Sequence, residues 1–168
     1  MFLMNRRCTA AAWGLVIAIL LRQAFRSPAS AAQQLWFRNQ LETPEIECLA
    51  ELIHASNWWK YTPQFADEMM RIAKVVRTDL SGRNHVAYLY LFEDGGWCGT
   101  AGCPMLIGER QDGGRCRLLY DGNGVDKVIV LRARDYGYRR LYLPCEVRFD
   151  GRQYQQRHPE CPTVDVQH

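Results

Sequence analysis

The fold class of this chain is decided by the stretch HVAYLYLF, which runs from His85 to Phe92. In an extended strand, successive side chains point to opposite faces. One face carries Val86, Tyr88, Tyr90 and Phe92, and the other carries Ala87, Leu89 and Leu91. Both faces are apolar, which is typical of a strand that is covered on both sides. The sequence therefore predicts a sheet in which this strand is central.

Further strands are expected on both sides of this stretch, because alternating patterns recur there between turn-forming sequences. The expected strands are 74–77, 103–109, 115–120, 125–132, 140–149 and 152–156. The expected turns include Asp112-Gly113-Gly114, Asp121-Gly122-Asn123-Gly124 and Asp150-Gly151. No alternation of strands and helices follows residue 73. The pattern predicts an antiparallel meander of six to seven strands.

Two short helices are expected before the meander. Thr43-Pro44-Glu45 is a helix start, in which Thr43 caps and Pro44 suits the first helical position. A stripe at helical spacing follows, made of Ile46, Leu49, Ala50 and Ile53. Thr62-Pro63 repeats the start signal, and a second stripe contains Phe65, Met69 and Ile72. The expected fold class is α+β, with both N-terminal helices packed on one face of the sheet.

Residues 1–31 predict a secretory signal peptide. Arg6 and Arg7 precede an apolar run at 10–21, and Ala29-Ser30-Ala31 supplies a small-residue cleavage site. The alternative is a retained membrane anchor, although a spanning helix needs about twenty apolar residues. Residues 32–42 then predict a linker, in which Leu35, Trp36 and Phe37 are able to pack, and 43–168 a single domain.

The charge of the chain is concentrated in this leader. The whole sequence has 21 basic and 18 acidic residues, but four arginines and no acidic residue precede position 32. The remainder therefore has 17 basic and 18 acidic residues. Such a domain has no electrostatic attraction to nucleic acid. We expect no nucleic-acid partner, and membrane contact only if the leader stays attached as an anchor.

Cysteine usage predicts a disulfide-bonded domain. Behind the leader stand six cysteines, at Cys48, Cys98, Cys103, Cys116, Cys145 and Cys161. An even number behind an export signal indicates a disulfide framework in an oxidising compartment. Cys98–Cys103 is the favoured pair, because Gly99 and Gly102 allow a tight turn between them. The pairing of the other four stays open, and buried free thiols are the alternative.

Four motifs carry a resemblance. They are Asp79-Leu80-Ser81-Gly82-Arg83-Asn84, Cys98-Gly99-Thr100-Ala101-Gly102-Cys103, Gly137-Tyr138-Arg139-Arg140-Leu141 and Asp150-Gly151-Arg152-Gln153-Tyr154. They lie in this order within residues 75–156, about half of the chain, and this stretch resembles a group of exported bacterial proteins of unassigned function. The resemblance implies a periplasmic or secreted, β-rich domain of the bacterial envelope and brings no activity with it. The first motif departs from the group, since Ser81, Arg83 and Asn84 replace more acidic or amide residues.

No constellation of residues predicts catalysis, a metal or a cofactor. The Asp79 turn offers too few carboxylates for calcium and is better explained as a hairpin turn capped by Asp79. Trp97-Cys98-Gly99 resembles a thiol oxidoreductase motif, but four residues separate its cysteines where that motif has two. The remaining histidine and cysteine spacings, such as His158 and Cys161, fit no closed zinc site. We therefore expect no catalytic residue.

Aromatic residues beside arginines are typical of surfaces that bind another protein. The candidate binding residues are Trp58, Trp59 and Tyr61 in one loop, and Tyr136, Tyr138, Arg139 and Arg140 in another. Such rings also close the core beneath long loops. We expect a non-catalytic protein-binding domain of inhibitor or immunity type, whose partner is another secreted or envelope protein. The alternatives are a structural or stress-related envelope protein without a soluble partner, and a thiol oxidoreductase.

Overall fold

A computed structural model of the chain describes residues 32–56, 66–94, 96–99, 102–124, 127–143 and 145–156. All of them belong to one compact unit, Ala32–His168. In chain order the elements are β1 (Gln33–Trp36), α2 (Thr43–Ala55), α4 (Ala66–Ile72), β2 (Ala73–Thr78), β3 (Ala87–Phe92), β4 (Cys103–Arg110), β5 (Cys116–Gly124), β6 (Lys127–Asp135), β7 (Tyr138–Tyr142), β8 (Glu146–Phe149) and β9 (Tyr154–Gln156).

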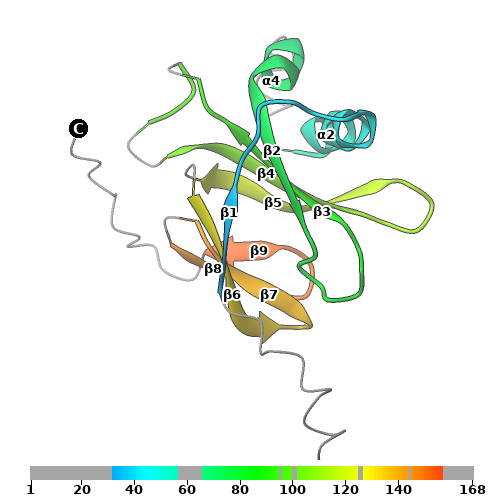
Figure 1. The fold of residues 1–168 in the computed structure, drawn as a ribbon, viewed down its shortest axis with the longest axis vertical. Helices are drawn as coiled ribbons and strands as arrows, with labels where there is room; N and C mark the ends of the chain where they lie inside the picture. Colours follow the sequence, from blue (N-terminus) through cyan, green and yellow to red (C-terminus); the bar gives the residue numbers. More distant parts are fainter. Residues whose placement is uncertain are drawn as a thin grey trace, which may run out of the picture. The chain divides into compact units, whose positions relative to one another are not determined.

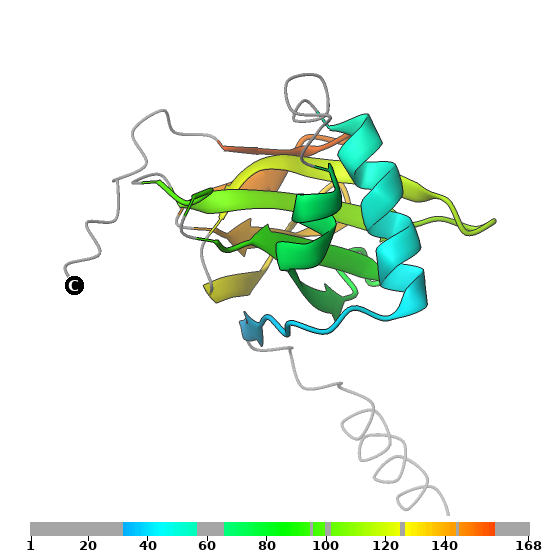
Figure 2. The same ribbon diagram turned by 90° about the horizontal axis from the view of Figure 1, so that it is seen from above.

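These elements form three layers (Figures 1 and 2). The helices cover a four-stranded sheet of order β2-β3-β4-β5, whose other face packs on a five-stranded sheet of order β1-β6-β7-β8-β9. All strand pairs are antiparallel. The predicted α+β class with helices on an antiparallel sheet is confirmed. The strands number nine instead of six or seven, and they divide into two sheets.

Strand β3 is central, as its sequence predicts. It pairs with β2 on one side and β4 on the other, and all six of its side chains are buried. Tyr90 and Phe92 pack in a cluster with Leu52 of helix α2. Leu89 and Leu91 pack in a second cluster, which contains inward-facing residues of the other sheet. Each face of β3 therefore supports a separate hydrophobic core.

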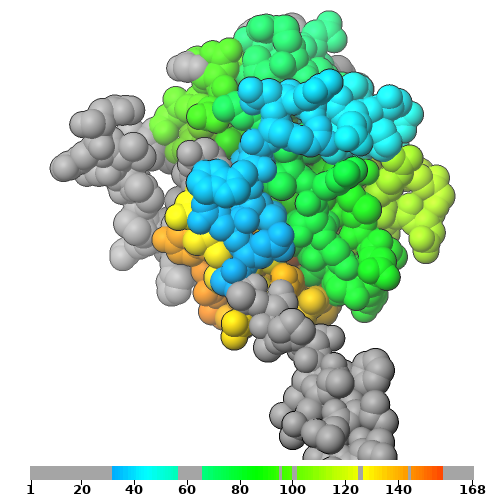
Figure 3. Space-filling model, in the orientation of Figure 1, coloured from blue at the N-terminus to red at the C-terminus, as the bar shows by residue number. Residues whose placement is uncertain are grey.

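The interpretation of residues 32–42 as a linker needs correction. Gln33–Trp36 form strand β1 at the edge of the five-stranded sheet, where Leu35 is buried opposite Val128. Arg38 then exchanges two backbone hydrogen bonds with Val75, in the other sheet. Figure 3 shows this segment in blue, lying between the green and the yellow-to-orange strands. The segment is a strand because it pairs with β6, and its buried Leu35 packs in the core between the two sheets.

Helix α2 begins as predicted near Thr43, but Glu42 is its cap and the buried face is rotated. Glu42 and Glu45 form a reciprocal capping box, so Thr43 is the first helical residue. Ile46 is 44% exposed, whereas Glu45 is buried. The buried residues are Glu45, Cys48, Leu49, Leu52 and Ile53. The Cys48 disulfide lies on this buried side, together with the apolar Leu49, Leu52 and Ile53.

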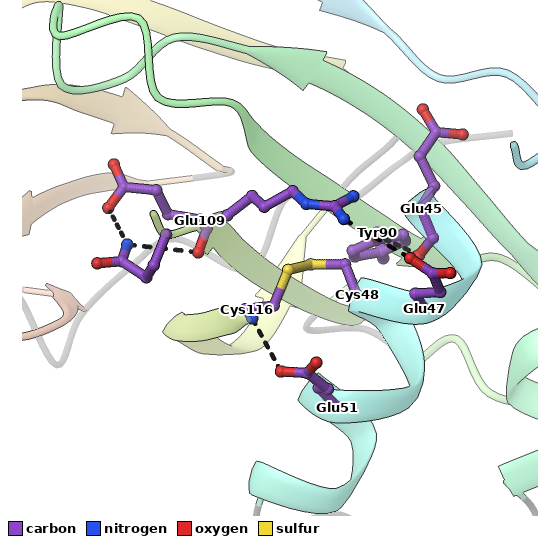
Figure 4. Close-up of a disulfide and its surroundings, with 9 residues drawn as sticks. Glu45, Glu47, Cys48, Glu51, Tyr90, Glu109 and Cys116 are labelled. Atoms are coloured by element: carbon purple, nitrogen blue, oxygen red, sulfur yellow. Dashed lines mark hydrogen bonds and ion pairs between the residues drawn. A yellow bond between two sulfur atoms is a disulfide. The ribbon is translucent and has the colours of Figure 1, made fainter. Parts of the chain in front are cut away.

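A disulfide and a close contact fix α2 on the sheet (Figure 4). Cys48 is bonded to Cys116, the first residue of β5, and the Glu51 carboxylate accepts a hydrogen bond from the Cys116 amide at 2.8 Å. Gly108 of β4 lies directly beneath Leu52, where a larger residue would meet the leucine methyl groups. The second predicted helix is confirmed at α4, which passes into β2 without a loop.

Two expected turns are placed differently in the structure. Asp121–Gly124 are not a turn but the last residues of β5, paired with β4. Glycine is needed there because Gly124 lies against the Met105 side chain, so a Cβ would clash. The single strand expected at 140–149 is instead β7 and β8, which pair with each other. Leu143 and Cys145 join them, with a backbone hydrogen bond of 2.8 Å.

The predicted Cys98–Cys103 disulfide is confirmed, and Cys145 is also disulfide-bonded. Cys161, His158 and the leader lie outside the described residues, so the signal peptide stays a prediction. Within the described ranges, neither helix combines the length and apolarity that crossing a membrane requires. The disulfides indicate an oxidising location outside the cytoplasm.

The two disulfides whose cysteines are both among the described residues close chain segments of different length, and the effects of their removal should differ accordingly. Cys48–Cys116 spans 68 residues and Cys98–Cys103 spans 5. Alanine at both positions should lower the free energy of unfolding by about 4 kcal/mol for the first pair and about 2 kcal/mol for the second. Urea unfolding of the oxidised variants measures both losses. Equal losses would contradict the assignment of Cys48–Cys116 as the main constraint.

Candidate functional site

Three turns gather at one end of the two packed sheets, which we call the hairpin end. They are residues 79–84 between β2 and β3, Tyr136-Gly137 between β6 and β7, and 150–153 between β8 and β9. The Arg139 amide donates to the Leu80 carbonyl at 2.9 Å, joining the first turn to β7. The Tyr136 ring lies beside Gly151, 3.8 Å from where a Cβ would stand. Residues far apart in the sequence thus form one continuous surface.

The first turn is held by the carboxylate of Asp79. This carboxylate accepts hydrogen bonds from the backbone amides of Gly82 at 2.6 Å and Asn84 at 2.9 Å, and from the Ser81 hydroxyl at 3.1 Å. Partial burial opposes ionisation, but these hydrogen bonds prevail and lower the pKa of Asp79. The sequence-based explanation of this stretch as a turn capped by Asp79 is confirmed.

Arg134 joins the first turn to the second. Its Nη1 donates to the backbone carbonyl of Gly137 at 2.6 Å and to that of Ser81 at 3.0 Å. Gly82 lies against the same guanidinium, because a Cβ at Gly82 would stand only 2.9 Å from Arg134 Nη2. The guanidinium therefore bridges two turns through backbone oxygens, without using a carboxylate.

A buried carboxylate, Glu109, lies behind the turns. Its side chain is 1% exposed, and its Oε2 accepts hydrogen bonds from Tyr138 at 2.7 Å, Gln111 at 2.8 Å and Arg117 at 3.1 Å. Tyr138 comes from the opposite sheet, so this network joins the two sheets. Figure 4 shows Glu109 on the side of β4 that faces away from α2. A buried carboxylate needs such donors, because an unpaired one is costly.

The second oxygen of Glu109 is less well satisfied. Oε1 is buried and accepts no hydrogen bond from the described residues, and His85 Nδ1 lies 3.9 Å from it. Arg117 also donates to the Tyr138 hydroxyl at 2.7 Å. Burial raises the pKa of Tyr138 to about 12, and the bond that it donates to Glu109 acts in the same direction. Tyr138 therefore acts as a neutral donor that positions β7.

Tyr136 is the exposed aromatic of the hairpin end, with 73% of its surface accessible. It occupies the first position of a two-residue turn in which Tyr136 has φ 49° and Gly137 has φ 88°. Positive φ at both positions is the pattern of a type I′ hairpin turn, which favours asparagine or glycine. A tyrosine there is held in a left-handed conformation that bulky residues rarely adopt. The turn projects the ring into solvent.

The candidate binding residues fall into three groups. Trp58, Trp59 and Tyr61 lie outside the described residues. Tyr138 is 7% exposed and stacks on Phe149, so it is a core residue and not a surface anchor. Arg139 is partly buried and joins both hairpins, since its amide bonds Leu80 and its carbonyl accepts from Tyr154.

Arg140 belongs to a different surface. It pairs with Asp135 at 2.8 Å and Glu146 at 3.2 Å on the outer face of the five-stranded sheet. Of the seven candidates, the structure therefore brings Tyr136, Tyr138 and Arg139 together at the hairpin end, with only Tyr136 strongly exposed.

The Cys98–Cys103 loop is a separate feature. A two-residue bridge between Gly99 and Gly102 closes it, and β4 begins at Cys103. The described residues at Cys98 do not begin a helix, the element that lowers a thiol pKa in thioredoxin-like sites. This arrangement favours a structural disulfide.

Sequence reasoning missed the Glu109 network. The available signal was the alternation of β4, in which Met105, Ile107 and Glu109 share one face, so that a carboxylate follows two core residues. Its partners Arg117 and Tyr138 come from other strands. Their proximity depends on the packing of two sheets, which the sequence did not reveal.

The Glu109–Tyr138 bond should be worth more than an ordinary tyrosine hydrogen bond, because its acceptor is a buried carboxylate. Tyr138→Phe should lower the free energy of unfolding by about 2 kcal/mol. The matched control is Tyr120→Phe, which removes a bond to the backbone carbonyl of Asn123 and should cost about 1 kcal/mol. Urea unfolding at neutral pH compares them, and an equal or smaller loss in Tyr138→Phe would contradict the role of Glu109.

The raised pKa of Tyr138 predicts a loss of stability in alkali. Unfolded tyrosine titrates near pH 10, and folded Tyr138 near pH 12. Between these values the folded chain holds the proton more tightly, so stability falls as pH rises. Buried Tyr90, Tyr120 and Tyr154 act in the same direction. Unfolding measured from pH 8 to 11 should show a shallower decline in Tyr138→Phe than in the wild type, and an unchanged slope would contradict this assignment.

No family model, curated protein or solved structure matches this chain. The resemblance of residues 75–156 to exported bacterial proteins of unassigned function therefore stays a prediction. What the hairpin end does must be inferred from its own contacts, exposure and charges.

Proposed function

We propose that this chain is an exported, non-catalytic domain that binds another protein in the bacterial envelope or outside the cell, with the hairpin end as its contact surface. The observation that carries the proposal is Tyr136. A bulky aromatic residue stands at a turn position where asparagine or glycine would be more stable, and its ring is exposed. A conformational outlier of this kind is typical of functional positions.

The chemistry of Tyr136 suits recognition. Tyrosine offers a large contact area with few rotatable bonds, and it is enriched among the residues that dominate binding energy. Arg83 lies beside the same turn, with Nη2 3.7 Å from the Cβ position of Gly137. An aromatic ring with an adjacent guanidinium is a combination found at the centres of protein interfaces.

The construction of the hairpin end supports the same proposal. Asp79, Arg134 and the Glu109 network fix the backbone on which Tyr136 stands. A surface that is rigid before binding loses less conformational entropy when the partner docks. This suits a small disulfide-bonded inhibitor of a secreted hydrolase, or an immunity protein against a secreted toxin.

The decisive variant is Tyr136→Asn, because it separates binding from folding. Asparagine is favoured in a type I′ turn, so the free energy of unfolding should rise by about 1 kcal/mol. Binding should fall at least tenfold, which corresponds to the loss of a central aromatic contact. The control is Tyr142→Thr, which removes an exposed tyrosine four residues along β7 and should leave binding unchanged.

The measurement is capture from envelope and secreted fractions on immobilised protein, followed by affinity determination for each captured protein. A partner retained equally by wild type and Tyr136→Asn would overturn the hairpin end as the contact surface. Capture of no protein above the level of an unfolded control would favour the structural or stress-related role. Thiol-exchange activity that disappears in Cys98→Ser would favour a thiol oxidoreductase.

A further inference from the structure

We infer that the hairpin end is an anion-seeking surface, and that its partner is a protein which presents a cluster of aspartate or glutamate side chains to it. This inference rests on the proposed function and specifies the chemistry of the partner. Its basis is the uneven distribution of unpaired charge over the described part of the domain.

Arginines outnumber carboxylates at the hairpin end. Apart from Arg140 and Asp135, which pair with each other, its turns and the strand ends behind them carry five arginines, Arg83, Arg117, Arg134, Arg139 and Arg152, and three carboxylates, Asp79, Glu109 and Asp150. Four of the arginines are exposed, namely Arg83, Arg117, Arg134 and Arg152. The surface is therefore positive although residues 32–168 together have one more acidic than basic residue.

The three carboxylates already have partners within the domain. Asp79 and Asp150 accept hydrogen bonds from backbone amides of their own turns, and Glu109 is buried. Hydrogen bonds to Gln153 and Arg152 lower the pKa of Asp150, which keeps this carboxylate engaged within its own turn. Each of these carboxylates has at least one oxygen engaged within the domain, whereas the guanidinium groups of Arg83 and Arg152 form no ion pair with the described residues.

Of these arginines, Arg83 is the best placed to contact a carboxylate of a partner protein. Its side chain is exposed beside Gly137, and neither a carboxylate nor a side-chain hydrogen bond within the described ranges engages its guanidinium. Arg134 likewise bonds only backbone carbonyls in that part of the chain. A guanidinium offers five donors in a planar fork that matches a carboxylate. Arg83 and Tyr136 therefore flank the same turn with complementary chemistry.

The helix-bearing side of the domain behaves differently. There four basic residues are paired with carboxylates, in the ion pairs Arg38–Glu42, Arg38–Glu45, Lys74–Glu93, Arg77–Glu42 and Arg110–Glu47. The outer face of the five-stranded sheet also neutralises its arginines, since Arg140 and Arg148 pair with Asp135 and Glu146.

Arg71, Arg115, Lys127 and Arg132 are also exposed and have no ion pair among the described residues. Arg71 shares α4 with the exposed Asp67, and Arg115 shares the β4–β5 turn with the exposed Asp112. The hairpin end differs in that its exposed arginines gather around turns whose carboxylates are already engaged.

A protein fits this surface better than a nucleic acid or a membrane. Polyanions attract proteins over long distances through net positive charge or long basic stripes. This domain has neither, because its total charge is slightly negative and its helix side carries exposed carboxylates such as Glu47 and Glu51. A local positive patch beside one aromatic ring matches an acidic patch on a protein, where charge steers encounter and fixes orientation.

The test uses the full chain, produced by export so that its disulfides form, and labelled for nuclear magnetic resonance. It is titrated with a short glutamate-rich peptide and with a lysine-rich peptide of equal length. The glutamate peptide should shift the amides of residues 79–84, 136–139 and 150–153, and about 0.5 M salt should abolish the effect. Arg83→Glu should weaken binding about fivefold to tenfold, and Arg83→Gln should weaken it less.

Lys127→Glu is the matched control. It makes the same change in charge at an exposed position at the opposite end of β6, and it should leave binding of the glutamate peptide unchanged. Equal weakening by Lys127→Glu would mean that only net charge matters, which would overturn the inference. The absence of shifts at the hairpin end, or equal shifts with the lysine peptide, would also overturn it.

Two further experiments distinguish this inference from its alternatives and from the proposed function. One measures binding of other ligands, and the other compares partner capture by two variants. Stronger binding of single-stranded DNA or of phosphatidylglycerol vesicles at the same residues would replace the protein partner by a polyanion or a membrane. A captured partner that is lost in Tyr136→Asn but retained in Arg83→Glu would leave the proposed function intact and overturn the acidic partner. If neither variant affects any captured protein, the proposed function itself fails.

Discussion

The burial of strand β3 on both faces is the constraint on which the rest of the structure depends. Six consecutive buried side chains need a cover on each side, since leaving either face in water would forfeit the apolar burial that drives folding. Helix α2 covers the Tyr90 face, and the five-stranded sheet covers the Leu89 face. The disulfide from Cys48 and the strand β1 are the means by which these covers are held in place.

Because the apolar cores fill the middle of the layers, the polar network of the domain lies near the ends of the sheets. Glu109 follows Met105 and Ile107 on the inner face of β4, so the strand carries its carboxylate into the space between the sheets. Tyr138 and Arg117 supply the donors that make this burial tolerable. The same bonds fix β7, and hence the turn that presents Tyr136. A buried ionic network thereby sets the geometry of an exposed residue.

The sequence predicts what depends on local pattern and misses what depends on packing. The central β3, the α4–β2 junction, the Asp79 turn and the Cys98–Cys103 pair follow from alternation and turn chemistry. The second sheet does not, because β1 has only one buried leucine and no pattern long enough to identify it. Helix α2 shows the same limit: Ile46 and Leu52 are equally apolar, but Leu52 packs on Gly108 of β4 while Ile46 is exposed, and this contact joins distant parts of the sequence.

Tyr136 and Tyr138 have different structural roles at the hairpin end, although they are only two residues apart. In a strand, residues two apart would share a face, but the left-handed backbone at Tyr136 and Gly137 breaks this relation. Tyr138 turns inward to Glu109, and Tyr136 stays in solvent beside Arg83. Glu109 is held by three donors on one oxygen, which suits a positioning group better than a general base, whose proton acceptor must be reachable. This rigid arrangement supports the proposal that the hairpin end is a contact surface.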